Sequence, residues 1–136
     1  MGAYQPVRRL FMSLQSGVDR FRYPFSMPED IGRDLGVDVT NRFNFDTFLE
    51  FLCSPTCLPR NLKRYMPRQD VEEMFSHAFR TERFPDKTRF SYYFNKRGWV
   101  MIELRFDNLG QLRRLFLQSP NIPEEGGLEI RLLNCN

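Results

Sequence analysis

The chain has 136 residues, of which 41% are hydrophobic and 15% aromatic, and this composition excludes a disordered chain and suffices for one domain, residues 1–136, with its own core. The formal net charge of +3 is too small to indicate a class of partner by itself. The 20 basic residues are 17 arginines and 3 lysines, which favours planar and stacking contacts, although an arginine-favouring codon composition would produce the same bias.

The N-terminal part of the chain, residues 1–84, is predicted to be mainly helical, with about four helices. Apolar residues recur at steps of three and four over residues 7–21, which predicts an amphipathic helix. A second helix is predicted to begin after Ser26, a candidate N-cap with Glu29 three residues later, and to end at Gly36.

Two further helices are predicted before the strands. Asn44 can cap a third helix that Pro55 prevents from continuing. A fourth helix begins at Pro67, with acidic residues near the positive end of its dipole. Each has an apolar stripe, formed in the third by Phe45, Phe48, Leu49 and Leu52 and in the fourth by Val71, Met74, Phe75, Ala78 and Phe79.

After Pro85 the spacing of apolar residues changes from a helical period to a period of two, which predicts strands. Residues 89–94 and 99–106 both alternate, and the loop between them contains the sequence NKRG. We therefore expect a β-hairpin with one apolar face, which forms a wall of the core. That face consists of Phe90, Tyr92, Phe94, Val100, Ile102, Leu104 and Phe106.

Two more strands are predicted towards the C-terminus. Gly110 suits positive φ in the turn DNLG before a strand at residues 111–118, and the loop NIPEEGG precedes a strand at residues 128–132. The complete prediction is an α+β fold. Its N-terminal helices pack on one face of a C-terminal antiparallel meander of about four strands, residues 85–136, and the other face is wet.

The cysteines and the single histidine are candidates for a zinc site or a nucleophile. Zinc sites use four such ligands, and Cys53, Cys57, His77 and Cys135 would supply four. The spacing in CSPTC is looser than that of a strong zinc motif, and free cysteines usually behave as small buried apolar residues. Any Cys–His mechanism would have to use His77, and no local motif supports one. We predict no metal, no cofactor and no catalytic residue.

The expected location is cytoplasmic. Neither the N-terminus nor any later segment contains an apolar run long enough for a signal peptide or a membrane span. An odd number of cysteines in a chain of this size is typical of a reducing compartment. We therefore expect no membrane partner.

A basic segment is the first candidate binding surface. Residues 51–69 contain no acidic residue. If residues 60–65 form a helical turn, Arg60, Lys63 and Arg64 share one face of that turn. Such a patch suits a phosphate, an RNA or single-stranded DNA backbone, or an acidic partner, and the alternative is a solvated connector. The patch consists of Arg60, Lys63, Arg64 and Arg68.

The outer face of the predicted hairpin is the second candidate surface, since it carries residues that are large for a wet face. These are Tyr93, Trp99, Met101 and Arg105. Such residues are enriched in protein-binding hot spots, and exposed apolar groups on a sheet usually indicate a partner. The same residues could stack on single-stranded bases. Alternatively, helices cover this face and Trp99 belongs to the core.

These patterns favour a small, non-enzymatic, cytoplasmic binding or regulatory protein that contacts another protein through the outer sheet face. One alternative is binding of RNA or single-stranded DNA through the arginine-rich patch. A second is a small-molecule pocket, or an enzyme with dispersed site residues, lined by the phenylalanine-rich inner surface. Association of copies through a sheet edge or face is a further alternative.

Overall fold

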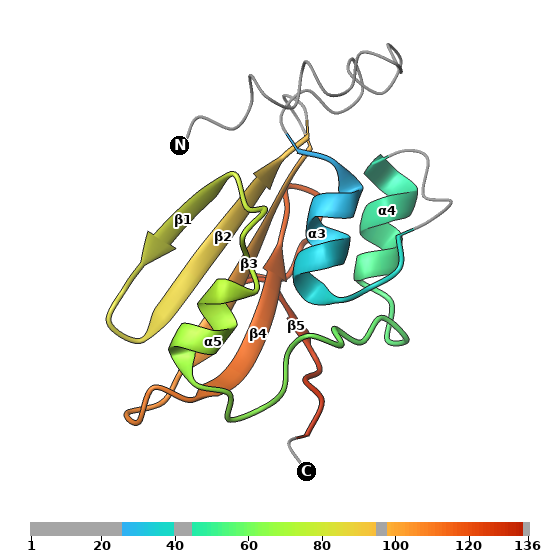
Figure 1. The fold of residues 1–136 in the computed structure, drawn as a ribbon. Coiled ribbons are helices and arrows are strands. Elements are labelled where there is room, and N and C mark those ends of the chain that lie inside the picture. Colours follow the sequence, from blue (N-terminus) through green and yellow to red (C-terminus); the bar gives the residue numbers. More distant parts are fainter. Residues whose placement is uncertain (1–25, 40–44, 95–97, 135–136) are drawn as a thin grey trace.

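The computed structural model describes residues 26–39, 45–94 and 98–134, which are organised around a five-stranded antiparallel sheet (Figure 1). The strands follow one another in space in the order β1-β2-β3-β4-β5, which confirms the predicted antiparallel meander but adds one strand to the four expected. Their bounds are β1 Arg80–Arg83, β2 Lys87–Tyr93, β3 Trp99–Phe106, β4 Leu112–Gln118 and β5 Leu128–Ile130.

The unexpected strand is β1, which has no apolar alternation to reveal it. Its sequence is RTER, and all four residues are exposed or half-buried. It pairs with β2, with Arg80 opposite Ser91 and Arg83 opposite Thr88, and it forms one edge of the sheet. Charged side chains on an edge strand discourage pairing with another chain. The pairing partner, rather than its own composition, makes this segment a strand.

Within the described residues, three helices lie on one face of the sheet (Figure 1). They are α3 Pro28–Leu35, α4 Phe45–Leu52 and α5 Arg68–Glu73. The prediction of about four N-terminal helices is therefore not supported, and the first of them, residues 7–21, lies outside the described residues. Asn44, the predicted cap of α4, lies outside them as well.

The helix predicted to begin at Pro67 is shorter than expected. It ends at Glu73. The N–H groups of Met74 and Phe75 then donate to carbonyls three residues earlier, as in the tighter turn of a 3₁₀-helix. The N–H of Phe79 then donates to the carbonyl of Ser91 at 2.9 Å. Pairing with β2 thus replaces continuation of the helix.

The second helix has the predicted position but a different cap. The N–H of Met27 donates to Oδ2 of Asp30 at 2.8 Å, which closes the first turn. Ser26 is not the cap, because its Oγ accepts the N–H of Tyr93 at 3.1 Å and ties the start of α3 to β2. Gly36 ends the helix with a φ of 77°, as predicted.

The inner face of the sheet forms the wall of the core that the alternation predicts. All seven residues assigned to the inner face of the β2–β3 hairpin are buried. They belong to one cluster with buried residues of the helices, such as Ile31, Phe48 and Val71. The rings of Phe48 and Phe94 meet edge-on at 5.4 Å, and Phe75 stacks on Phe90 at 4.3 Å. The aromatic content of the hairpin is thereby largely explained by packing.

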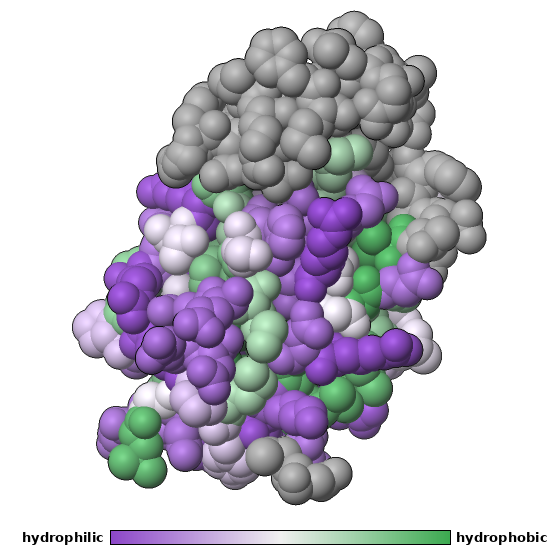
Figure 2. Space-filling model, viewed as in Figure 1, coloured by the Kyte–Doolittle hydropathy of each residue, from purple (hydrophilic) through white to green (hydrophobic). Residues whose placement is uncertain are grey.

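The helix-bearing side of the molecule has a mixed surface. Figure 2 shows hydrophilic residues over α5 and the β1 edge, and hydrophobic residues beside α4. Leu109, in the turn between β3 and β4, is 81% exposed. In the part of the chain that the structure describes, no helix combines the length and the apolar character needed to cross a lipid bilayer.

Candidate functional site

The outer face of the sheet, opposite the described helices, carries arginine, glutamate and aromatic side chains in register. Strand pairing places Arg89 of β2 opposite Glu103 of β3, and Glu103 opposite Phe116 of β4. In the adjacent row Arg105 of β3 is directly opposite Arg114 of β4. Like charges in this position repel each other, so the face requires compensating groups nearby.

Glu103 provides the first compensation at the centre of the face. Its side chain is only 1% exposed, and its two carboxylate oxygens accept Nε of Arg89 at 2.9 Å and Nε of Arg105 at 2.7 Å. Burial by itself raises the pKa of Glu103, but the hydrogen bonds from Arg105 and Arg89 outweigh it and lower the pKa below its usual value. Glu103 is therefore ionised at neutral pH and holds both guanidinium groups in place.

Phe116 and Glu129 provide the second compensation. The guanidinium carbons of Arg105 and Arg114 lie 4.1 and 5.0 Å from the centroid of the buried Phe116 ring. Arg114 also donates two hydrogen bonds to Glu129 of β5, at 3.0 and 2.7 Å. Cation–π stacking and bidentate pairing thus orient these arginines before any partner arrives.

The four residues predicted to bind a partner lie on this same face. Tyr93 and Trp99 are opposite each other in the β2–β3 register, and Met101 and Arg105 follow Trp99 along β3 with the same parity. All four are half-buried, so none is the open hot spot that the sequence suggested. We call the combined set the outer surface. It consists of Tyr93, Trp99, Met101 and Arg105, together with Arg89, Arg114 and Phe116.

The residues that sequence reasoning missed here are Arg89, Glu103, Arg114 and Phe116. The alternation itself puts Arg89 and Glu103 on the outer face without including them in the binding surface, and the parity of β4 adds Arg114 and Phe116. The alternation gave no sign that Glu103 is buried, because that depends on which side chains flank it across the strands. Ser91, which is opposite Met101 and so shares the outer parity, is buried as well.

The basic segment does not form the predicted helical turn over residues 60–65. Lys63 forms a parallel bridge with Leu133, which draws the segment alongside the end of the sheet. Tyr65 has a φ of 76°, which lies outside the helical region. Arg60, Lys63 and Arg64 therefore do not share a helical face, and the prediction that they would is wrong. Pairing with the C-terminal segment competes with a helix here.

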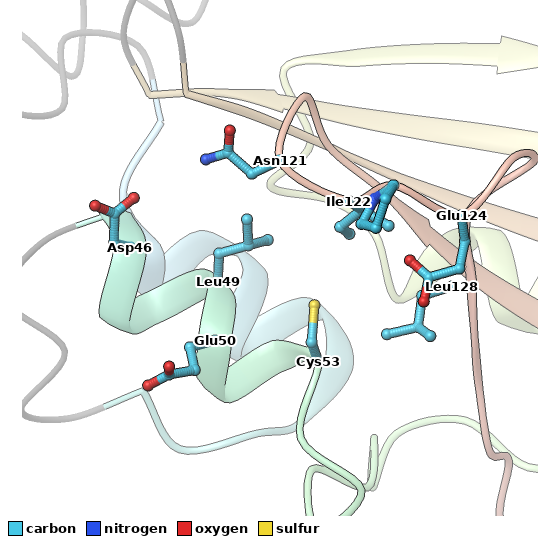
Figure 3. Close-up of a pocket in the computed structure, with 9 residues that line it drawn as sticks. Asp46, Leu49, Glu50, Cys53, Asn121, Ile122, Glu124 and Leu128 are labelled. Carbon is cyan, nitrogen blue, oxygen red and sulfur yellow. The ribbon is translucent and has the colours of Figure 1, made fainter.

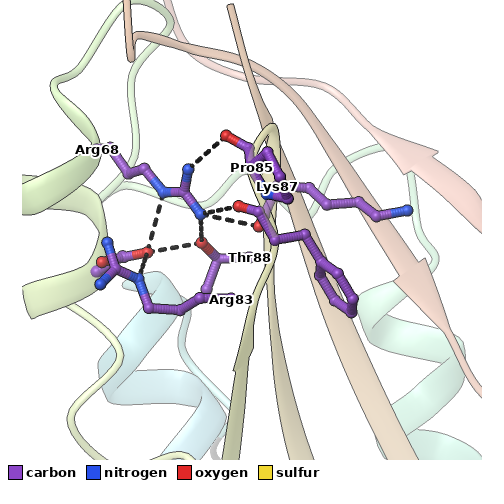
Figure 4. Close-up of polar contacts among 7 residues, drawn as sticks. Arg68, Arg83, Pro85, Lys87 and Thr88 are labelled. Carbon is purple, nitrogen blue, oxygen red and sulfur yellow. Dashed lines mark hydrogen bonds and ion pairs between the residues drawn. The ribbon is translucent and has the colours of Figure 1, made fainter.

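Arg68, the fourth residue of the predicted patch, is used inside the fold (Figure 4). Its Nε donates to Oε2 of Glu72 at 3.2 Å, and the hydroxyl of Thr88 donates to the same oxygen at 2.6 Å. Its Nη atoms donate at 2.6–2.9 Å to the carbonyls of Phe84, Pro85 and Lys87 and to the Thr88 hydroxyl. These bonds tie α5 to the β1–β2 turn and engage the donors that an external anion would need.

His77, whose side chain is 34% exposed, lies at the edge of a polar cluster centred on the buried Asp34. Nδ1 of His77 lies 2.8 Å from Oδ1 of Asp34, and the Tyr92 hydroxyl donates to Oδ2 of Asp34 at 2.6 Å. Burial raises the pKa of Asp34, and the hydrogen bonds from Tyr92 and His77 offset this only in part. The cluster joins α3, β2 and the turn after α5.

Cys53 and Cys57 follow the end of α4. Burial raises the pKa of both thiols, with further contributions from the charge of Glu124 for Cys53 and from Cys53 for Cys57. Both are protonated at neutral pH and are weak nucleophiles in that state. Cys135 lies outside the described residues. Among those described, no group of three or more His, Cys, Asp or Glu side chains is arranged to hold a metal ion.

A pocket of about 440 Å³ lies between α4 and the β4–β5 loop (Figure 3). Its lining combines apolar side chains with three carboxylates, namely Leu49, Ile122 and Leu128 with Asp46, Glu50 and Glu124. This composition suits a ligand with an apolar body and a cationic group. The inner-face phenylalanines of the sheet do not line it, so it differs from the phenylalanine-lined pocket considered from the sequence.

The outer surface therefore offers the strongest structural basis for a function. Its arginines come from β2, β3 and β4 and are held by a buried carboxylate and a buried ring. No family model, curated protein or solved structure matches the chain.

Proposed function

We propose that this is a small binding protein that contacts another protein through the outer surface. The observation that supports the proposal best is the buried Glu103, which holds Arg89 and Arg105 on the face opposite the described helices. Arginines that are already oriented lose less side-chain entropy on binding. Such a surface favours recognition of a partner without reorganisation of the sheet.

The chemistry of the outer surface indicates the kind of partner. Arg89, Arg105 and Arg114 can donate paired hydrogen bonds to carboxylates. Trp99 and Met101 add an apolar contact area of the type found in hot spots. The fitting partner is a protein whose contact region carries carboxylates beside apolar side chains.

Site-specific photo-crosslinking in the native host tests this function. A photoreactive residue in place of Met101 is expected to join the full chain to another protein, since Met101 lies between Trp99 and Arg105 on β3. The matched control replaces Leu109, which is more exposed but lies in the β3–β4 turn. Equal crosslinking from both positions would contradict the proposal, and products that disappear after nuclease treatment would indicate nucleic acid instead.

The variant Trp99→Ala provides a second readout. It should abolish the crosslink from position 101 while lowering the thermal midpoint only modestly, because Trp99 is half-buried. A collapse of the midpoint would instead place Trp99 in the core. In that case Met101→Gln replaces Trp99→Ala as the test variant, and the photoreactive residue is moved to position 93. This tests the outer surface without altering Trp99.

Binding of RNA or single-stranded DNA by Arg60, Lys63, Arg64 and Arg68 is the weaker proposal. The donors of Arg68 are engaged within the fold, and only Arg60 and Lys63 are well exposed. Such binding would weaken steeply as salt is added, because it releases condensed counterions. An affinity that does not change with salt would exclude it.

A further inference from the structure

A second group of arginines surrounds a hollow at the β4–β5 end of the sheet. The hollow has a volume of about 320 Å³ and lies where the segment containing Arg64 meets β4 and the residues after β5. Its charged lining residues are Arg64, Arg113, Arg114, Arg131 and Glu129. Four arginines and one glutamate give a formal charge of +3. Only Arg64 belongs to the basic patch that the sequence predicted.

A β-bulge brings two consecutive arginines to this hollow. The β3–β4 register shifts so that Arg105 is opposite Arg114, whereas Phe106 is opposite Leu112. Arg113 is therefore the additional residue of the bulge. In a regular strand adjacent side chains point to opposite faces, but here Arg113 and Arg114 are both exposed and both line the hollow.

Arg64 enters the hollow from a segment fixed by backbone bonds. Its N–H donates to the carbonyl of Leu133 at 2.8 Å, and the N–H of Tyr65 donates to the carbonyl of Leu112 at 2.7 Å. The side-chain Nε of Arg64 is buried and has no hydrogen-bond partner in the part of the chain that the structure describes. A buried donor without an acceptor is costly, and an oxygen atom of a bound anion would satisfy it.

Two of the remaining arginines, Arg113 and Arg114, are already oriented and partly neutralised by their neighbours. Arg113 lies over the ring of Tyr65 at 4.9 Å and 3.4 Å from Oδ2 of Asp107. The hydrogen bond from Arg114 is the largest influence that lowers the pKa of Glu129, so this carboxylate stays ionised and remains paired with Arg114. Its charge reduces the positive potential of the hollow without cancelling it.

We infer that this hollow binds a phosphoryl group, either inorganic phosphate or the phosphate of a monoester. Guanidinium groups match phosphate oxygens in planar, bidentate geometry, and the surplus of positive charge suits a dianion. One bounded hollow favours a single phosphoryl group over the repeated phosphates of a nucleic acid. The site shares Arg114 with the outer surface but does not depend on the proposed protein partner.

Calorimetric titration of the full chain tests the site, with inorganic phosphate and glycerol phosphate as ligands at constant ionic strength. We expect saturable binding of one ligand per chain. Arg64→Gln and Arg131→Gln should each weaken the affinity about tenfold or more, the effect of losing one charge-assisted hydrogen bond. Arg60→Gln removes the same charge outside the hollow and should leave the affinity unchanged. The tighter of the two ligands identifies free or esterified phosphate as the source.

Thermal unfolding separates a binding role from a structural one. Phosphate should raise the midpoints of the unmodified chain and of Arg60→Gln by similar amounts, and the midpoint of Arg64→Gln by clearly less at the same phosphate concentration. Because Nε of Arg64 donates no bond within the described chain, Arg64→Gln without ligand should unfold near the unmodified midpoint. If Arg64→Gln fails to fold, Arg131→Gln supplies the same comparison.

Three results would overturn the site. They are no saturable binding of either ligand, equal weakening by Arg60→Gln, and binding only of an oligonucleotide without a terminal phosphate, which would indicate a nucleic-acid backbone. Failure here is distinguishable from failure of the protein-binding proposal. Arg64→Gln and Arg131→Gln alter no residue of the outer surface and should retain the crosslink from position 101.

Discussion

At the scale of single residues, two buried carboxylates have opposite properties because their neighbours differ. Glu103 and Asp34 are each 1% exposed. Glu103 is held by two guanidinium groups, which lower its pKa, whereas the partners of Asp34 are the Tyr92 hydroxyl and His77, which leave its pKa raised. Burial alone therefore does not decide the ionisation of an acidic side chain, and the charge of its partners does.

The cluster around Asp34 leads to a first prediction. Asp34→Ala leaves the fully buried Tyr92 hydroxyl without its acceptor and should lower the free energy of unfolding by about 2–4 kcal/mol. Asp34→Asn keeps an acceptor at the same place and should cost less than half as much. Urea denaturation at neutral pH measures both. Similar losses for the two variants would mean that the Tyr92 hydrogen bond contributes little.

At the scale of elements, the end of α3 shows how one position joins two segments. Asn61 donates from Nδ2 to the carbonyls of Arg33 and Asp34, at 2.7 and 3.2 Å, and so satisfies the last turn of the helix. A Cβ atom at Gly36 would lie 2.6 Å from Oδ1 of Asn61 and 2.8 Å from its backbone N. Gly36 therefore permits both the left-handed helix end and the approach of Asn61.

This geometry gives a prediction with an internal control. Gly36→Ala should lower the free energy of unfolding by about 2–4 kcal/mol, because left-handed strain and displacement of Asn61 add together. Gly110 has a similar φ of 73° but open space around its Cβ position, so Gly110→Ala should cost only about 1 kcal/mol. Thermal unfolding of the two variants measures the difference. Equal losses of stability in the two variants would show that Asn61 moves aside at no energetic cost.

At the scale of the whole molecule, carboxylates that are paired within the fold set how stability depends on pH. Burial raises the pKa of Glu72 and of Glu103, but hydrogen bonds from Thr88 and Arg68, and from Arg105 and Arg89, outweigh it and lower both values. Each therefore contributes stability above the usual pKa of glutamate that is lost as pH falls through the lowered value. The pKa of Asp34 is raised, so its contribution to stability is present at low pH and is lost as pH rises.

We therefore expect the thermal midpoint to fall as pH decreases below about 4.3, the usual pKa of glutamate. Among the described carboxylates, the pKa values of Glu72, Glu103, Asp107 and Glu129 are lowered, whereas that of Asp34 is raised. Glu103→Gln should cost about 1–2 kcal/mol near neutral pH, allowing for solvent screening of the half-exposed Arg105. Its midpoint should then fall less on acidification. Midpoints measured for both chains between about pH 3 and pH 7 test this, and parallel curves would exclude Glu103 as a source of acid sensitivity.

The sequence by itself determined the elements whose signals are local. Apolar periodicity predicted α4 and the β2–β3 hairpin, capping signals ending at Gly36 predicted α3, and the turn at Gly110 preceded the predicted strand β4. Parity alone assigned Tyr93, Trp99, Met101 and Arg105 to one face. These succeed because a helical or strand period repeats within a few residues and depends little on the rest of the chain.

Only the tertiary structure decided the features that depend on pairing between distant segments. β1 is a strand because β2 pairs with it, and residues 60–65 are not helical because Lys63 pairs with Leu133. Likewise, cross-strand register places Glu103 between Arg89 and Arg105, and a bulge directs consecutive arginines towards Arg64. Register and bulges arise from contacts far apart in sequence, which no local pattern of residues encodes.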